Sequence, residues 1–273
     1  MDDLRTTAMV DDGAAGRAGS PAPTPAGVHI PQLTRRGVLG VWAAAAVPMG
    51  LLAWVVAPLV AGRLEGPGAL ARALIPCLTI GLVWQFVLVL ALVRREQGTL
   101  RWSVLRQALW LRAPRDPRSG RRGGRLWLIL PVLMLGFFAS GLAPSLPHDA
   151  GRDFGVFLAS DAAPAVLGGS WGWFAVLVTL WVFNSALGEE LLFRGYLLPR
   201  MAGAFGRWDW LANGVLFAGY HLHMWWAMPR ILLDALTLAL PSRYYRSALI
   251  GIAVHTTQTV FICALVLPIV LAG

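Results

Sequence analysis

The sequence predicts an all-α polytopic membrane protein, a bundle of about seven transmembrane helices, from three observations. The chain of 273 residues is 57% hydrophobic and only 14% charged, with a mean hydropathy of +0.62. A soluble domain of this length has no means of burying so much apolar surface, whereas a lipid bilayer covers it. The apolar residues gather in runs of spanning length, and the 13 Trp suit the boundary between lipid and water.

Each predicted span is one of these apolar runs. A helix needs about 20 apolar residues to cross a hydrocarbon core of about 30 Å. The predicted spans are 37–62, 71–93, 126–146, 170–192, 209–227, 229–241 and 245–271, of which the sixth is the shortest. Residues 1–36 are rich in Ala, Pro, Gly and charge without periodicity, which predicts a disordered cytoplasmic tail. We therefore expect one transmembrane domain over 37–273, with its motif-bearing core at 170–271.

The placement of arginine predicts the orientation in the membrane. All 23 basic residues are Arg, which suggests a GC-rich bacterial genome and hence the inner membrane. Ten of them lie in 94–125, whereas 147–169 has one Arg and three Asp. Basic loops face the cytoplasm, so we expect the N-terminus and 94–125 there and 147–169 outside. This pattern explains the net charge of +9 without a nucleic-acid partner.

Four ionisable side chains fall inside the predicted spans, where such residues are costly and by default mark function. They are Glu189, Glu190, His221 and His255. A rise of about 1.5 Å per residue places them at similar depths, in the half of the bilayer nearer the cytoplasm. Because several helices meet at one depth to build a site in a bundle, we expect an intramembrane polar site facing the cytoplasmic side.

The two adjacent glutamates are expected to act differently. Glu190 and Arg194 are spaced i, i+4 with the acid first, the favourable order for a helical ion pair that braces the site. Glu189 is rotated by about 100° from that face and has no partner in sequence. A desolvated, unpaired carboxylate suits a general base. Asn184, one turn earlier, is assigned equally to site lining and to packing.

Two further helices supply the remaining polar side chains. His221 follows Phe217 by one turn on the same face, and Phe217 is assigned as a structural, orienting residue. His223 is shifted by about 200° in an α-helix and is assigned to a boundary or packing role. In the last span, one face carries a histidine followed by an amide and a hydroxyl that can orient it or bind a reacting oxygen. These three residues are His255, Gln258 and Thr259.

This set of side chains predicts hydrolysis. A carboxylate deprotonates water, two imidazoles polarise or protonate the carbonyl, and a polar side chain stabilises the oxyanion. The combination of Glu189, His221 and His255 also suits a divalent metal such as zinc with an open position. The residues alone leave metal-assisted and metal-free hydrolysis both open.

Three motifs in order carry a resemblance to a known family. Residues 189–194, EELLFR, have the form EExxxR, and residues 217–221, FAGYH, have the form FxxxH. His255 follows in a late apolar helix where the family has HxxxN. Over roughly 170–271 the chain therefore resembles the CPBP family of glutamic-type intramembrane endopeptidases, which includes the CAAX prenyl proteases and their bacterial relatives.

The resemblance implies an intramembrane peptidase acting on a membrane-associated protein or peptide. It implies that Glu189 activates water, that His221 and His255 complete the site, and that the site opens toward the cytoplasm. One position departs from the family pattern: Thr259 stands where the usual Asn is expected. Thr is shorter than Asn, so Gln258 is an alternative source of the missing amide.

Other functions fit the same buried residues. A catalytically silent membrane scaffold, or a binding protein of the bacteriocin-immunity type, is the main alternative, and in it Glu189 is dispensable. A proton-coupled carrier also uses buried Glu and His, but it favours inverted repeats, and no repeat is visible in the sequence. Polar side chains that merely join helices are a further alternative, which the matched depths on three helices disfavour.

Overall fold

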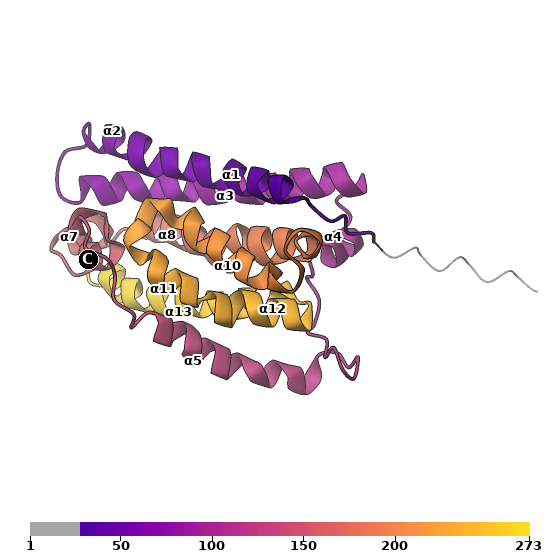
Figure 1. Cartoon of the computed structure of the whole chain (residues 1–273). Helices are drawn as coiled ribbons and strands as arrows, with labels where there is room; N and C mark the ends of the chain where they lie inside the picture. Colours follow the sequence, from indigo (N-terminus) through magenta and orange to yellow (C-terminus); the bar gives the residue numbers. More distant parts are fainter. Residues whose placement is uncertain (1–27) are drawn as a thin grey trace, which may run out of the picture.

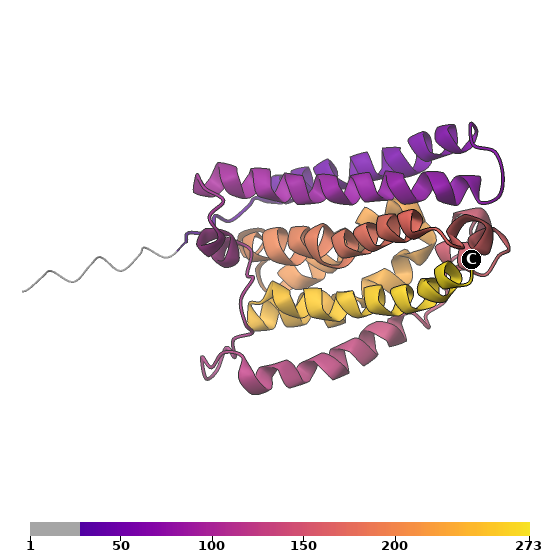
Figure 2. The ribbon, with the colours of Figure 1, turned by 180° about the vertical axis from the view of Figure 1, so that it is seen from behind.

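The computed structural model describes residues 28–273, which are helical apart from connecting segments and one isolated bridge between Arg115 and Arg122. The long helices lie side by side along one common direction (Figures 1 and 2). Four of them are long and apolar enough to cross a membrane: Arg35–Ala61, Ala69–Gln97, Trp171–Arg200 and Ala248–Leu271. This confirms the predicted all-helical membrane protein, while the count of seven spans stays a prediction.

Shorter helices connect and accompany these four. The elements of the first half are α1 (Arg35–Leu51), η1 (Leu52–Val56), α2 (Ala57–Ala61), α3 (Ala69–Gln97), α4 (Trp102–Ala108), η2 (Gly124–Ile129), α5 (Leu130–Ser140), η3 (Ala150–Arg152), α6 (Phe154–Leu158) and α7 (Ala162–Leu167). The second half continues with α8 (Trp171–Val182), η4 (Phe183–Leu187), η5 (Leu191–Leu197), η6 (Leu198–Arg200), α9 (Ala202–Phe205), η7 (Gly206–Trp208), α10 (Asp209–Tyr220), η8 (His221–Ala227), α11 (Met228–Leu233), η9 (Ala235–Ala239), α12 (Leu240–Tyr245) and α13 (Ala248–Leu271).

The outer surface of the bundle is apolar. Large hydrophobic side chains project outward from several helices, including Leu59, Ile80, Leu135 and Val260, each more than half exposed. A water-soluble protein rarely leaves so many large apolar side chains uncovered over one surface. In lipid the same side chains need no cover, so this surface is the one that contacts acyl chains.

The long helix Trp171–Arg200 is not a regular α-helix near its glutamates. It passes through two π-helical stretches, η4 and η5, which flank Gly188. Backbone N–H of Gly188 donates to the carbonyl of Phe183 at 2.6 Å. A Cβ on Gly188 would lie 3.0 Å from the carbonyl oxygen of Leu82, so glycine lets α3 pack closely here. Such π stretches occur often at functional sites, and here they rotate the glutamates relative to α8.

One end of the bundle is closed by hydrogen bonds between segments far apart in sequence. Leu33 donates its N–H to the carbonyl of Arg200 at 2.9 Å, and Gln32 donates from Nε2 to the carbonyl of Pro199 at 3.0 Å. Arg200 pairs with Glu96 at 2.7 Å, which joins the end of α3 to η6. This is the end at which α4 and α12 lie in Figure 1.

The predicted N-terminal tail falls mostly on residues 1–27, which lie outside the described residues. Residues 28–34, also placed in that tail, have no helix of their own and lie against the bundle through the bonds of Gln32 and Leu33. Thr34 then caps α1 by accepting from the N–H of Gly37 at 3.1 Å. The first long helix thus begins at Arg35, two residues before the predicted start.

Candidate active site

The predicted brace is present and lies in the interior. Glu190 and Arg194 are fully buried, and Nη1 of Arg194 donates to Oε1 of Glu190 at 2.9 Å. The guanidinium also lies over the ring of Phe217, 4.0 Å from its centre. The carboxylate and the aromatic ring together stabilise the guanidinium charge, which lipid cannot solvate. Phe217, predicted as an orienting residue, therefore contacts the brace.

His255 joins the same brace from α13. Its Nδ1 lies 3.1 Å from Oε1 of Glu190, and because a carboxylate oxygen accepts, Nδ1 carries the proton. Its other nitrogen, Nε2, lies 3.3 Å from Nδ2 of Asn184. The bond to Glu190 thus fixes the orientation of the ring, and Asn184 contacts a site residue as well as packing between helices.

Glu189 and His221 form the second half of the cluster. Oε1 of Glu189 lies 3.7 Å from Nε2 of His221, too long for a direct hydrogen bond. Nδ1 of His221 lies 2.8 Å from the carbonyl oxygen of Phe217, so Nδ1 is the donor and Nε2 faces the carboxylate. Oε2 of Glu189 is buried with no hydrogen-bond partner among residues 28–273. Within the described residues, the carboxylate therefore has an oxygen free to accept a hydrogen bond from another group.

Thr259 and Gln258 differ in what their side chains contact. Oγ1 of Thr259 lies 2.9 Å from Oγ of Ser185 and 3.3 Å from the carbonyl oxygen of Trp181. A threonine hydroxyl has one proton to donate, and these two acceptors on the Trp171–Arg200 helix compete for it. Gln258 lines the same cavity as Glu189 with its side chain half-buried. Thr259 therefore contributes mainly to helix contact, whereas the amide of Gln258 faces the open space.

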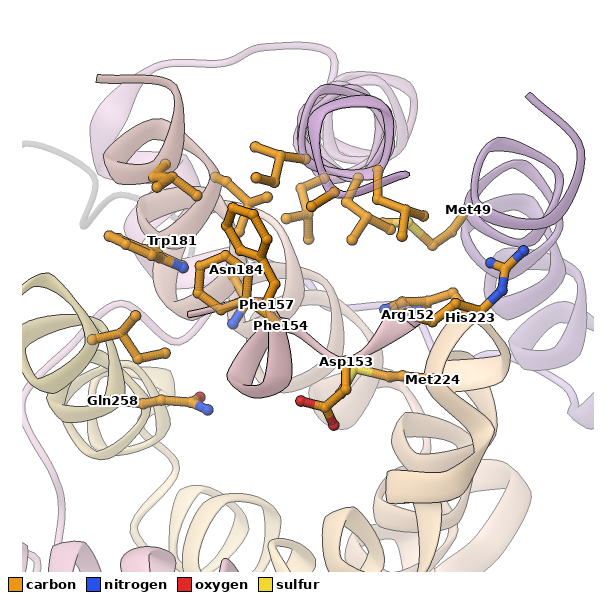
Figure 3. Close-up of a pocket in the computed structure, with 18 of the residues that line it drawn as sticks. Met49, Arg152, Asp153, Phe154, Phe157, Trp181, Asn184, His223, Met224 and Gln258 are labelled. Atoms are coloured by element: carbon orange, nitrogen blue, oxygen red, sulfur yellow. The ribbon is translucent and has the colours of Figure 1, made fainter. Parts of the chain in front are cut away.

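A cavity of about 200 Å³ opens beside Glu189. Figure 3 shows Phe154, Asn184 and Gln258 on one side of the cavity, Arg152 and His223 on the other, and Asp153 between them. Most of the wall is aliphatic or aromatic, and the polar lining side chains are few. They are Arg152, Asp153, Asn184, Glu189, Tyr220, His223, Gln258 and Thr259.

The cavity lies toward one end of the bundle. The site was expected to face the cytoplasmic side, taken as the end that holds 94–125, and which end faces the cytoplasm stays a prediction. The lining of the cavity instead includes Ala71 and 151–157, at the end where α7 and the C-terminus lie, and no residue of 94–125 (Figure 1). The physical reason is the closure of the other end by 28–34, η6 and their hydrogen bonds, which spacing along single helices does not predict.

A strap formed by residues 146–157 covers the cavity end. On one side, Nη1 of Arg152 donates to the carbonyl of Ala53 at 3.2 Å, and its guanidinium stacks on Trp54 at 3.8 Å. On the other side, the ring of His148 stacks on Trp226 with centroids 4.5 Å apart. The strap is thus attached to two different helices across the opening.

The structure also corrects the placement of His223. Its ring lies beside that of His221, with centroids 5.4 Å apart and planes 28° from parallel. The prediction that it points the other way assumed a continuous α-helix, but α10 ends at Tyr220 and a 3₁₀ stretch follows. Sequence reasoning also gave no role to Tyr220, although both it and His223 line the cavity with Glu189.

The side chains of the cluster are not arranged to bind a metal ion. No group of three His, Cys, Asp or Glu residues in the part of the chain that the structure describes is placed to hold one ion. Nε2 of His221 faces Glu189 at 3.7 Å, whereas Nε2 of His255 lies 3.3 Å from Nδ2 of Asn184, so the two free imidazole nitrogens have different neighbours. The residues present do not fit the metal alternative, and no step below depends on a metal.

Comparison with known proteins agrees with the motifs. The family model described as type II CAAX prenyl endopeptidase Rce1-like matches residues 171–261. This segment contains the brace, both histidines, Gln258 and Thr259. Neither a curated protein nor a solved structure matches the chain. The match confirms, for the motif-bearing third of the chain, the resemblance predicted from the sequence.

Proposed function

Because residues 171–261 are Rce1-like, we propose that the protein is an intramembrane endopeptidase that hydrolyses a peptide bond in a membrane-associated protein or peptide. The observation that carries this proposal is the state of Glu189. Its carboxylate is 1% exposed, one oxygen has no partner among the described residues, and a cavity reaches it. A buried carboxylate kept free beside an open space is what general-base catalysis needs.

The arrangement of acceptors suggests how water is held. Oε1 of Glu189 and Nε2 of His221 are both acceptors, 3.7 Å apart, and one water molecule can donate a proton to each. The water oxygen then keeps a lone pair for attack on a peptide carbonyl. Glu189 takes the proton that the water loses and returns it to the leaving amine, so the peptide bond breaks and one water is consumed.

Glu190, Arg194 and His255 act as a frame in this proposal. Glu190 accepts from both Arg194 and His255, which fixes three side chains from two helices relative to one another. Fixed positions of the groups around the reacting atoms contribute much of an enzyme's rate, because a misplacement of about 1 Å can lower the rate by about 10²-fold. Nε2 of His255 lies 3.3 Å from Nδ2 of Asn184, a side chain that lines the cavity beside Glu189.

The finer features of location follow from the sequence and remain part of the proposal. We place the protein in a bacterial inner membrane with the N-terminus in the cytoplasm, on the arginine distribution. The helices α5, α10 and the segment 228–245 complete a bundle of seven spans in this view. The expected partners are the lipid bilayer and one or more substrates that themselves sit in or on the membrane.

The test compares protein termini in cells that make the wild-type protein or Glu189→Gln at matched levels. The proposal predicts new membrane-protein termini that appear with the wild type alone, which also identifies the substrate. Indistinguishable termini, together with full rescue of any deletion phenotype by Glu189→Gln, would favour the silent scaffold instead.

A further inference from the structure

A buried hydrogen bond outside the recognised motifs lies at the wall of the same cavity. Nε2 of Gln85, on α3, lies 2.5 Å from the hydroxyl oxygen of Tyr220, at the end of α10. Both side chains are 0% exposed. The two residues are 135 positions apart in sequence, and their immediate neighbours in both helices are mostly apolar.

Gln85 lowers the stability of the folded protein at its buried position. It lies near the middle of the apolar span Ala69–Gln97. Its Oε1 has no hydrogen-bond partner within residues 28–273. A buried amide without full hydrogen bonding costs about 1–3 kcal/mol, so an apolar residue would be the more stable choice. Among the described residues, its side chain bonds to Tyr220, so the amide at this position orients that phenol.

The phenol is left with a proton to donate. Gln85 donates to the oxygen of Tyr220, so the hydroxyl proton points elsewhere, and no acceptor for it is found among the described residues. Accepting a hydrogen bond also makes a hydroxyl a better donor, because successive hydrogen bonds polarise one another. Tyr220 lines the cavity together with Glu189, and its ring centroid lies 5.0 Å from that of His221.

Thr259, which stands where the family pattern has Asn, does not offer a free hydrogen-bond donor to the cavity. Hydrolysis through a tetrahedral intermediate places a negative charge on the former carbonyl oxygen, which needs at least one hydrogen-bond donor. Thr259 directs its hydroxyl to Ser185 and Trp181, so its proton is already used in helix contact. Donors that line the cavity then include the Gln258 amide and the Tyr220 hydroxyl.

We propose that the Tyr220 hydroxyl, oriented by Gln85, donates a hydrogen bond to the oxyanion formed when water attacks the substrate carbonyl. This inference rests on the proposed peptidase function and deepens it. The water oxygen bonds to the carbonyl carbon, Glu189 receives the water proton, and the carbonyl oxygen becomes the anion held by Tyr220. When the carbon–nitrogen bond breaks, the oxyanion returns to a carbonyl and the amine takes the proton from Glu189. Tyr220 keeps its own proton throughout.

The test uses the full-length protein reconstituted in liposomes and a fluorogenic peptide spanning a terminus that appears only with wild-type protein and not with Glu189→Gln. We expect Tyr220→Phe to lower kcat by about 10²–10³-fold with KM little changed, the effect of losing one oxyanion donor. Tyr244→Phe, which removes the same hydroxyl from a side chain that is 45% exposed, should leave kcat unchanged.

Gln85 is a positioning residue in this account, and a double variant tests that role. Gln85→Leu should lower kcat without raising KM, and Gln85→Leu combined with Tyr220→Phe should be no slower than Tyr220→Phe alone. Additive losses would mean that Gln85 acts by some other route. If Tyr220→Phe does not fold, fluorotyrosine at position 220 keeps the shape and changes the acidity of the phenol, so kcat should change.

Each outcome bears on one of the two claims. If wild type and Glu189→Gln give the same termini, the peptidase proposal fails and this inference fails with it. If Glu189→Gln is inactive while Tyr220→Phe and the fluorotyrosine protein both keep the wild-type kcat, the peptidase stands and the role of Tyr220 is refuted. Loss of kcat in Gln258→Leu with an unaffected Tyr220→Phe would assign the donor to Gln258.

Discussion

His255 directs Nδ1 at Oε1 of Glu190, 3.1 Å away, and this contact ties α13 to the buried acid of the Trp171–Arg200 helix. The same oxygen accepts from Nη1 of Arg194 at 2.9 Å. Glu190 therefore neutralises a guanidinium that is 0% exposed and orients a histidine with one oxygen. Glu189, its neighbour in sequence, makes neither contact, so the two acids have separable roles.

These separate roles predict that the same Glu→Gln change lowers Tm at position 190 but not at position 189. Glu190→Gln removes the counter-charge of a buried arginine, and breaking a buried ion pair in this way costs about 3–5 kcal/mol. We expect a large fall in Tm, or loss of folded protein, in detergent. Glu189→Gln is the matched control and should keep the wild-type Tm, because no ion pair to arginine is lost. Equal Tm values for the two variants would contradict the assignment of Glu190 as the brace.

Gly251 on α13 offers a steric test of the brace. A Cβ at this position would collide with Oε2 of Glu190 and lie 3.3 Å from Cγ of Arg194. We expect Gly251→Ala to displace the pair, lowering both Tm and activity. Gly50→Ala in α1 is the control, since nothing lies within 4 Å of a Cβ built there. The prediction fails if Gly251→Ala matches Gly50→Ala in Tm and in cleavage rate.

We predict that the hydrogen bond between Thr259 and Ser185 stabilises the folded protein. Thr259→Val and Ser185→Ala should each lower the free energy of unfolding by about 0.6–2 kcal/mol, the range for interhelical hydrogen bonds in membranes. In a double-mutant cycle the two losses should not add, because either change breaks the same 2.9 Å bond. Cleavage by folded Thr259→Val should stay near the wild-type rate. A loss of kcat as large as that of Glu189→Gln would instead give Thr259 a catalytic role.

The apolar wall of the cavity predicts an effect on substrate binding. Leu78 on α3 lines the cavity, so Leu78→Phe should narrow it and raise KM severalfold for the fluorogenic peptide. Ile80, two residues later, is 59% exposed on the lipid-facing surface, so Ile80→Phe adds the same ring where lipid accepts it. KM should be unchanged in that control. Equal KM values for both variants would mean that substrate does not enter this cavity.

The sequence predicted those features that depend on composition and on spacing within one helix. Hydropathy placed the starts of the four long helices to within three residues, since lipid imposes a length on each of them, while the helix Trp171–Arg200 runs eight residues beyond its predicted end. The i, i+4 spacing of Glu190 and Arg194 predicted an ion pair that the structure contains. The predicted convergence of Glu189, His221 and His255 also matches the geometry, although their roles in catalysis stay predictions.

Features that depend on irregular backbone or on contacts between distant segments were not predicted. His223 was misplaced because an α-helical rotation was applied beyond Tyr220, where α10 ends. The π-helical stretches beside Gly188 have no sequence signal that periodicity reveals. The pair of Gln85 and Tyr220 joins two helices with no motif, and the cavity direction depends on how the strap 146–157 and the opposite end pack.

Hydrolysis in ¹⁸O-labelled water by reconstituted protein tests the central claim most directly. Wild-type protein and Glu189→Gln, at equal amounts of folded protein, are incubated with the peptide that spans the identified terminus. Wild-type protein should release a new C-terminal carboxyl carrying one ¹⁸O from solvent, while Glu189→Gln should release none above background. Equal release by both proteins, or no release by either, would contradict a role for Glu189 in activating water.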